Sequence, residues 1–139
     1  MCKVNPMRLV LCRHGETNLN AQKRLQGWVD TSLNERGRMQ ARLTGEHLRN
    51  EKFDCAFCSP LNRTRETFAE IMRFHEGTPF YFRDELREIN IGIYSGMDRR
   101  EIEEKYPGRW AKRVDRSTSS CMKAGRATSQ WTKPASGRF

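Results

Sequence analysis

The stretch Val10-Leu-Cys-Arg-His-Gly-Glu-Thr-Asn-Leu-Asn20 decides the fold, because it joins an apolar run to a polar loop. The short apolar run at 8–12 is followed by a glycine at position 15, which predicts a buried strand rather than a helix. Residues 16–25 then have a helical pattern that stops at Gln26-Gly27. A strand that turns into a helix through a glycine presents backbone N–H groups and a helix N-terminus to an anion. The stretch therefore predicts a phosphate-binding loop at the end of a strand.

Strands and helices alternate along the residues that follow. Asn34 is suited to begin a helix, because its side chain can accept a hydrogen bond from a first-turn N–H group. The expected elements are a helix from Asn34 to about Asn50, a strand over 53–58, a helix over 63–75 and a strand over 80–83. This alternation predicts βαβ units, and hence an α/β fold with a mostly parallel sheet and helices on both faces.

The composition changes near residue 113. The 139 residues carry 26 Lys and Arg against 17 Asp and Glu, a net charge of +9, and 36% of them are hydrophobic. Residues 114–139 are rich in Ser, Thr, Lys, Arg, Gly and Ala, and their few apolar residues follow neither helical nor strand spacing. Such a segment buries too little apolar surface to offset the entropy lost on ordering it. We expect a domain over 1–113 and a basic, disordered tail over 114–139.

The charge and the cysteines limit the classes of partner. A basic balance favours anionic partners, but Arg99-Arg100 and Lys112-Arg113 are too short for a nucleic-acid interface. No apolar run reaches the length of a membrane-spanning helix. An odd number of cysteines and no hydrophobic leader segment indicate a reduced, cytoplasmic protein. We expect a small phosphorylated substrate, and neither a membrane nor a nucleic acid as partner.

Polar residues follow the expected strands at points that can meet in one crevice. A neutral imidazole such as that of His14 can attack phosphorus, and the adjacent Arg13 can hydrogen-bond two phosphate oxygens. Arg63 opens the helix after the second strand, so it can reach the same crevice. Glu88, after the third strand, is a candidate general acid that we expect to be partly buried. Taken singly, each residue also has a simpler interpretation as a structural histidine or a surface charge.

The order and spacing of these motifs resemble the histidine phosphatase superfamily, the phosphoglycerate mutase-like group, from about residue 8 to about residue 110. The resemblance implies a phosphoglycerate mutase-like α/β fold, no metal and no cofactor. It also implies an enzyme, a phosphoric monoester hydrolase that works through a phosphohistidine. Glu16-Thr17 and Ile91 resemble the phosphatase branch, which includes fructose-2,6-bisphosphatase-like and broad-specificity enzymes. Cofactor-dependent phosphoryl transfer of the phosphoglycerate mutase type stays the alternative.

The resemblance further implies roles for single residues. Arg13-His14-Gly15 is similar to the Arg-His-Gly motif whose histidine accepts the phosphoryl group, and the stretch from Gly27-Trp28 to Gln40-Ala41 fits the segment that follows it. The implied catalytic residues are His14 as nucleophile and Glu88 as proton donor, and the implied substrate-binding residues are Arg13, Asn20 and Arg63.

The resemblance is incomplete towards the C-terminus. The family's second histidine, followed by glycine on a later strand, has no counterpart, since His47 and His75 fall on expected helices. One such transition-state contact is worth about 10²–10³ in rate, and an absent strand leaves an unpaired sheet edge. We therefore expect the N-terminal part of a histidine phosphatase domain, truncated at its C-terminal end, with weak or lost activity.

Three other functions remain open on the sequence. Cys55-x-x-Cys58 suggests a metal site, but residues three apart on a strand point to opposite faces, so we expect two small core residues instead. A truncated isoform could bind phosphorylated ligands or a full-length partner without catalysis. The tail over 114–139 could bind nucleic acid, with an affinity that falls steeply as salt rises. The sequence leaves the oligomeric state open.

Overall fold

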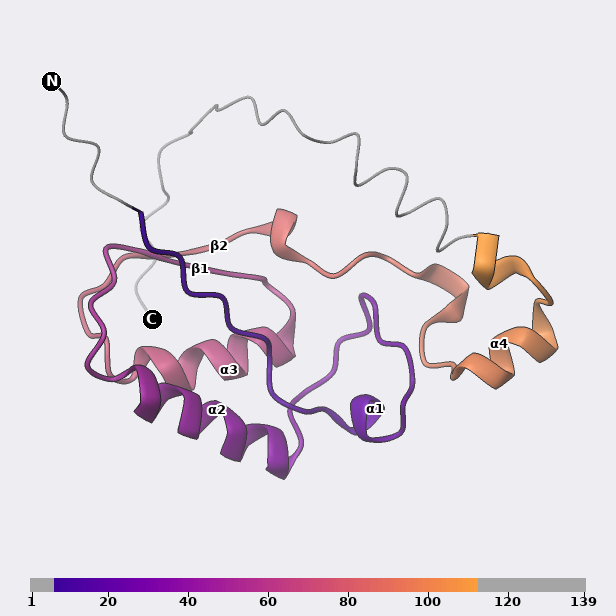
Figure 1. The fold of residues 1–139 in the computed structure, drawn as a ribbon, viewed down its shortest axis with the longest axis horizontal. Helices are drawn as coiled ribbons and strands as arrows, with labels where there is room; N and C mark the ends of the chain where they lie inside the picture. The colour runs from indigo at the N-terminus through magenta and orange to yellow at the C-terminus, as the bar shows by residue number, and fades with distance from the viewer. Residues whose placement is uncertain (1–6, 113–139) are drawn as a thin grey trace, which may run out of the picture.

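Two parallel strands and two long helices form the centre of the fold (Figure 1). The computed structural model describes residues 7–112, so the expected tail over 114–139 lies outside the described residues. The helices are α1 (Asn18–Ala21), α2 (Glu35–Leu48), α3 (Asn62–Met72) and α4 (Arg99–Lys105), the strands are β1 (Ala56–Cys58) and β2 (Phe80–Phe82), and two 3-10 turns follow at η1 (Asp84–Leu86) and η2 (Gly92–Tyr94).

The strands and α3 form one βαβ unit. β1 and β2 pair in parallel, with Ala56 opposite Phe80 and Cys58 opposite Phe82. The chain passes from one strand to the other through α3, which packs against β1. The α/β fold class and the parallel pairing predicted from the alternating pattern are thus confirmed. Within residues 7–112, Figure 1 shows α2 and α3 lying together on one side of the strand pair.

The longest helix, α2, begins where its local sequence predicts. The side chain of Asn34 accepts a hydrogen bond of 2.8 Å from the N–H of Gly37, which satisfies one first-turn donor. α2 then packs closely along α3. At Gly45 a Cβ would lie 2.7 Å from the carbonyl oxygen of Glu70, so no side chain fits there. Small residues therefore set how closely the two helices approach.

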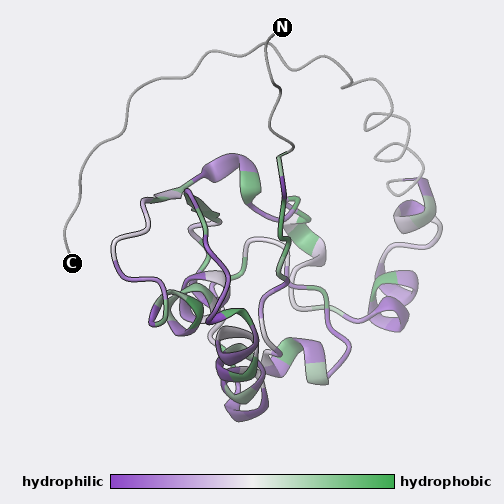
Figure 2. Cartoon of the chain, turned by 60° about the vertical axis from the view of Figure 1, so that its left-hand side comes forward, coloured by the Kyte–Doolittle hydropathy of each residue, from purple (hydrophilic) through white to green (hydrophobic). Residues whose placement is uncertain are grey.

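The predicted strand over 8–12 is wrong. This segment has no regular secondary structure and joins neither β1 nor β2. Leu9 is 69% exposed and Leu11 is 84% exposed, and Figure 2 shows the segment as a hydrophobic stretch leading down from the N-terminus. An apolar run becomes a strand only where another strand takes up its N–H and C=O groups. Within the described residues no strand pairs with it.

The predicted helix over 16–25 is also shorter than expected. It is reduced to the single turn of α1, which Thr17 and Asn20 close through a capping box. Lys23 has a φ of 56°, a left-handed conformation that cannot continue a right-handed helix. Residues 22–25 therefore belong to a loop instead of a further helical turn.

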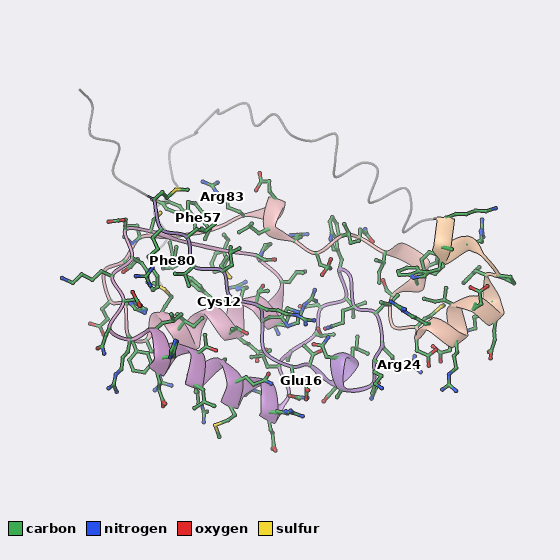
Figure 3. All side chains as sticks on the ribbon, in the orientation of Figure 1. Cys12, Glu16, Arg24, Phe57, Phe80 and Arg83 are labelled. Atoms are coloured by element: carbon green, nitrogen blue, oxygen red, sulfur yellow. The ribbon has the colours of Figure 1, made fainter. Side chains whose placement is uncertain are left out.

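This loop is held by a hydrophobic cluster. Ile91, Tyr94 and Ile102 are buried together, and Leu25 packs against them. The N–H of Gly96 donates to the carbonyl oxygen of Leu25 at 2.8 Å, so the two segments are also joined through their backbones. The preceding residue, Arg24, which is labelled in Figure 3, donates two hydrogen bonds of 2.9 and 2.8 Å to the carboxylate of Glu101 in α4. The loop after α1 is thereby fixed against residues 91–102.

Candidate active site

His14 is presented by the loop between the extended segment and α1. Its Nδ1 lies 2.7 Å from the carbonyl oxygen of Gly15. Since a carbonyl oxygen only accepts, Nδ1 carries the proton of the neutral ring and Nε2 holds the lone pair. Burial lowers the pKa of His14; the Gly15 hydrogen bond opposes this shift, and the charges of Arg63 and Arg13 add to it. The neutral form with a nucleophilic Nε2 is therefore favoured.

Two glycines bring the His14 loop against the first turn of α2. A Cβ at Gly15 would overlap the carbonyl oxygen of Gly37, and a Cβ at Gly37 would overlap that of Glu16. The N–H of Asn34 also donates to the carbonyl oxygen of Glu16 at 3.0 Å, and the Asn34 side-chain amide donates to the Glu16 carboxylate at 3.0 Å. The backbone of Gly15 and Glu16, directly after His14, is therefore held against the start of α2.

The three backbone N–H groups after His14 are all used inside the protein. Those of Gly15, Glu16 and Thr17 donate to Thr67 Oγ1 at 3.0 Å, Gln40 Oε1 at 2.9 Å and Asn20 Oδ1 at 3.2 Å. The expectation that these groups surround a phosphate is therefore wrong. A phosphate at His14 has to be bound mainly by side-chain donors.

Arg63 supplies such donors from the first turn of α3. Only 2% of the residue is exposed, and its Nη1 and Nη2 donate to the carbonyl oxygens of Val29 at 3.1 Å and Gly27 at 2.9 Å. Its buried Nε–H has no partner among the described residues. Burial lowers the pKa of Arg63, while the charges of Glu88 and Asp30 oppose the shift. A buried guanidinium with unused N–H groups is suited to bind an anion.

Arg13 and Glu88 add charges of both signs beside His14. Arg13 is exposed, and its charge acts on His14 and on Arg63. Glu88 is exposed too, so the expectation of partial burial is wrong. Its Oε1 accepts a hydrogen bond of 3.1 Å from the N–H of Ile89, and its charge also acts on both His14 and Arg63. The structure thus brings four of the five expected site residues together.

Asn20, the fifth expected site residue, is engaged locally. Its Oδ1 accepts a hydrogen bond from the N–H of Thr17, and its own N–H donates to Thr17 Oγ1 at 3.2 Å. The Asn20 side-chain NH₂ group has no partner among the described residues. This NH₂ group is the part of Asn20 that remains able to contact a ligand.

Two residues in contact with the site were not assigned a role from the sequence. Thr67 accepts from the Gly15 N–H, and its signal is its place as the last threonine in Ser-x-Leu-x-Arg-Thr-x-x-Thr. Trp28 donates its indole N–H to the carbonyl oxygen of Glu88, and the guanidinium of Arg87 lies 5.1 Å over the same ring. Nothing in the sequence near Trp28 indicates this partner.

The other histidines lie apart from these groups. His47 is exposed on α2, as expected for a solvated helix face. His75 follows the end of α3, is only 7% exposed and packs its ring 4.9 Å from that of Phe53. Neither histidine is among the groups whose charge acts on His14.

Cys55 and Cys58 lie in different environments. Cys58 is buried on β1, as expected, and burial raises its pKa to about 11. Cys55 is exposed, so its assignment to the core is wrong. Among residues 7–112, no group of three or more His, Cys, Asp or Glu side chains is placed to hold a metal ion. No helix in this part of the chain has the length and apolar character needed to cross a bilayer.

The sequence matches a known enzyme family over most of its length. Residues 9–135 match the sequence model of the Histidine phosphatase superfamily (branch 1). A probable phosphatase of Schizosaccharomyces pombe is 35% identical over 121 residues, which cover 84% of this chain and 58% of that protein. Phosphoserine phosphatase 1 of Hydrogenobacter thermophilus is 40% identical over 101 residues, covering 73% and 47%. This chain spans about half the length of the curated relatives it matches.

The fold agrees with the sequence match. A mycobacterial glucosyl-3-phosphoglycerate phosphatase superposes with a TM-score of 0.64 at 30% identity, covering 71% of this chain and 47% of that chain. The family match, the sequence identities and the shared fold all indicate the same group of proteins, whose Arg-His-Gly motif corresponds to Arg13, His14 and Gly15. The chain belongs to the histidine phosphatase superfamily, in its phosphatase branch.

Proposed function

We propose that the chain hydrolyses phosphate monoesters of small molecules through a phosphohistidine at His14. One observation carries the proposal: the hydrogen bond from His14 Nδ1 to the carbonyl oxygen of Gly15 leaves Nε2 as the nucleophile. The lowered pKa of His14 keeps this nitrogen unprotonated. The phosphatase names of the relatives support hydrolysis rather than transfer to a second substrate.

In the first step, Nε2 attacks the phosphorus of the substrate and a nitrogen–phosphorus bond forms. The guanidinium groups of Arg63 and Arg13 bind the phosphoryl oxygens and stabilise the charge that develops on them. The bond from phosphorus to the ester oxygen breaks, and the protonated carboxyl of Glu88 gives its proton to that oxygen. The products are a free alcohol, phospho-His14 and the carboxylate of Glu88.

In the second step, water attacks the same phosphorus. The carboxylate of Glu88 takes a proton from this water, the nitrogen–phosphorus bond breaks, and inorganic phosphate leaves. His14 regains its lone pair on Nε2, and its Nδ1–H stays bonded to the Gly15 carbonyl oxygen throughout. The exposure of Glu88 supports this step, because water reaches its carboxylate.

The proposed reaction is slow in this chain. Arg63 and Arg13 are the cationic groups that act on His14, and within residues 7–112 no second histidine joins them. One donor to the transition state is worth about 10²–10³ in rate. We therefore expect phosphorylation of His14 to be measurable in a single turnover, and steady-state hydrolysis to be weak.

The test is whether His14 becomes phosphorylated. The chain is incubated with a ³²P-labelled small phosphate ester, quenched in base to preserve a phosphoramidate, and the label is located by mass spectrometry. We expect label on the unaltered chain and none on His14→Ala. His47→Ala, a change on an exposed face of α2, is the matched control and should keep the label. Label on His14→Ala, or none on the unaltered folded chain, would refute the proposal.

We further propose that the chain works in the cytoplasm. Cys12, Cys55 and Cys58 are free thiols, and two of them are exposed. Exposed thiols persist where the surroundings are reducing. Microscopy of the tagged chain beside a cytoplasmic marker tests the location.

A further inference from the structure

Thr67 links the His14 loop to the helix that carries Arg63. Its Oγ1 accepts a hydrogen bond of 3.0 Å from the N–H of Gly15 and donates one of 2.9 Å to the carbonyl oxygen of Arg63. Thr67 is only 5% exposed, and Gly15 is buried with it. One buried hydroxyl therefore joins the residue after the nucleophile to the backbone of the buried arginine.

The direction of both bonds follows from the chemistry of a hydroxyl. Its single proton goes to the carbonyl oxygen of Arg63, which can only accept. This bond from a threonine to the carbonyl four residues earlier fixes the side-chain rotamer within the helix. A lone pair of Oγ1 is then left for the N–H of Gly15. The rigid helix α3 thus sets where that N–H has to lie.

Gly15 passes this constraint on to His14. Its N–H is held by Thr67, and its Cα is packed against the Gly37 backbone so closely that no Cβ fits. The Gly15 carbonyl lies in the next peptide plane, whose N–H belongs to Glu16 and donates to Gln40 Oε1 at 2.9 Å. With the backbone held on both sides of the Gly15 Cα, the carbonyl oxygen keeps pointing at His14 Nδ1 at 2.7 Å. The same carbonyl selects the tautomer in which Nε2 is the free base.

We propose that Thr67 is a positioning residue for the nucleophile. Through Gly15 it holds the His14 ring in the Nδ1–H tautomer and at a fixed position relative to the guanidinium of Arg63. The effect on the tautomer is a property of the folded chain. The effect on phosphorylation rests on the proposed function, so the two are measured separately.

Three variants separate the hydroxyl of Thr67 from its size. Thr67→Val keeps the shape and removes both hydrogen bonds, and Thr67→Ser keeps the hydroxyl. Thr44→Val is the matched control, because Thr44 makes the same bond to a carbonyl four residues earlier, 2.9 Å from Gln40 O, on α2. Thermal unfolding followed by circular dichroism shows that each variant is folded before it is compared.

The first measurement is the tautomer of His14, read from the imidazole ¹⁵N shifts in two-dimensional NMR. We expect the unaltered chain, Thr67→Ser and Thr44→Val to show one dominant Nδ1–H tautomer. Thr67→Val should show a mixture of both tautomers. Thr67→Val with an unchanged tautomer, or a folded Thr67→Ser with a mixture, overturns the proposal. A mixture in Thr67→Val beside one tautomer in Thr67→Ser assigns the effect to the hydroxyl.

The second measurement compares two oxyanions as probes. Inorganic phosphate tests the guanidinium groups, whereas orthovanadate, which accepts a fifth ligand, also tests the position of Nε2. Thr67→Val should weaken vanadate binding by about 10–100-fold and phosphate binding by less than about threefold. Equal losses for both anions indicate a structural role alone and overturn the positioning role. A fixed tautomer in a chain whose His14 is never phosphorylated refutes the proposed function and leaves the inference on Thr67 standing.

Discussion

The indole N–H of Trp28 donates a hydrogen bond to the backbone carbonyl oxygen of Glu88, sixty residues further along the chain. The bond joins the loop after α1 to the segment between η1 and η2. The guanidinium of Arg87 lies 5.1 Å over the same indole ring and adds a cation–π contact. Glu88 is exposed, so its place beside His14 depends on what holds its backbone rather than on burial.

Trp28→Phe keeps the aromatic ring under Arg87 and removes the N–H. We expect hydrolysis of alkyl phosphates to slow by about tenfold, because an alkoxide leaving group needs the proton from Glu88. Hydrolysis of p-nitrophenyl phosphate should change little, since nitrophenolate leaves without a proton. Rates on both substrates check this. Trp110→Phe is the control, because the Trp110 ring packs against Tyr94, with ring centroids 5.4 Å apart. An equal loss on both substrates would show that Trp28 does not position Glu88.

The lowered pKa of His14 predicts how stability depends on pH. The unfolded histidine titrates near its ordinary value of 6.5, whereas the folded one titrates below it. Below pH 6.5 the unfolded chain therefore binds a proton that the folded chain does not, so stability falls as pH falls through this range. Urea unfolding at pH 7.5 and 5.5 should show a smaller loss for His14→Gln than for the unaltered chain. His47→Gln, on the exposed face of α2, should not reduce the loss; if it does and His14→Gln does not, the assignment is wrong.

Arg63→Lys tests the buried guanidinium while keeping its charge. A lysine cannot bond both the Gly27 and the Val29 carbonyl oxygens and still present a donor to phosphate. We expect phosphate affinity, measured by calorimetry, to fall by at least about tenfold. The free energy of unfolding should fall by about 1.5–3 kcal/mol. Arg65→Lys, on the exposed side of the same helix, should change neither quantity, and a similar loss there would contradict the role of burial.

Gly15→Ala tests the close approach of the His14 loop to α2. The added Cβ would overlap the carbonyl oxygen of Gly37, so the loop or the helix has to move. Overpacking of this kind costs about 1–3 kcal/mol, and phosphorylation of His14 should be lost with it. Gly77→Ala is the control: it has a φ of 83° but no neighbour near its Cβ, so it costs only about 1 kcal/mol of backbone strain. A milder effect at Gly15 than at Gly77, measured by urea unfolding, would refute the close contact.

Local signals predicted the elements whose hydrogen bonds are local. The cap at Asn34 lies three residues from the N–H it satisfies, so the start of α2 can be read from neighbouring residues. The βαβ unit followed from the alternation of apolar runs with helical spacing. The strand over 8–12 was predicted by the same reasoning and is wrong, because a strand needs a partner that its own residues do not specify.

The site divides in the same way. The sequence alone determined that a histidine, an arginine and a glycine stand together after an apolar run, and that Arg63 and Glu88 follow later elements. It did not show that the loop N–H groups are taken by Thr67 and Gln40, since these side chains come from α3 and α2.

By itself, the sequence of this protein determined the order of its elements, its family and the identity of the candidate nucleophile, because caps, apolar periodicity and motif spacing act over a few residues. Only the tertiary structure decided that Nε2 of His14 is the free nitrogen, that Arg63 is buried and that Glu88 is exposed. The physical reason is that burial, and the contacts that hold the backbone around the site, are set by residues far apart in the chain, such as Gly15 with Thr67 and Trp28 with Glu88.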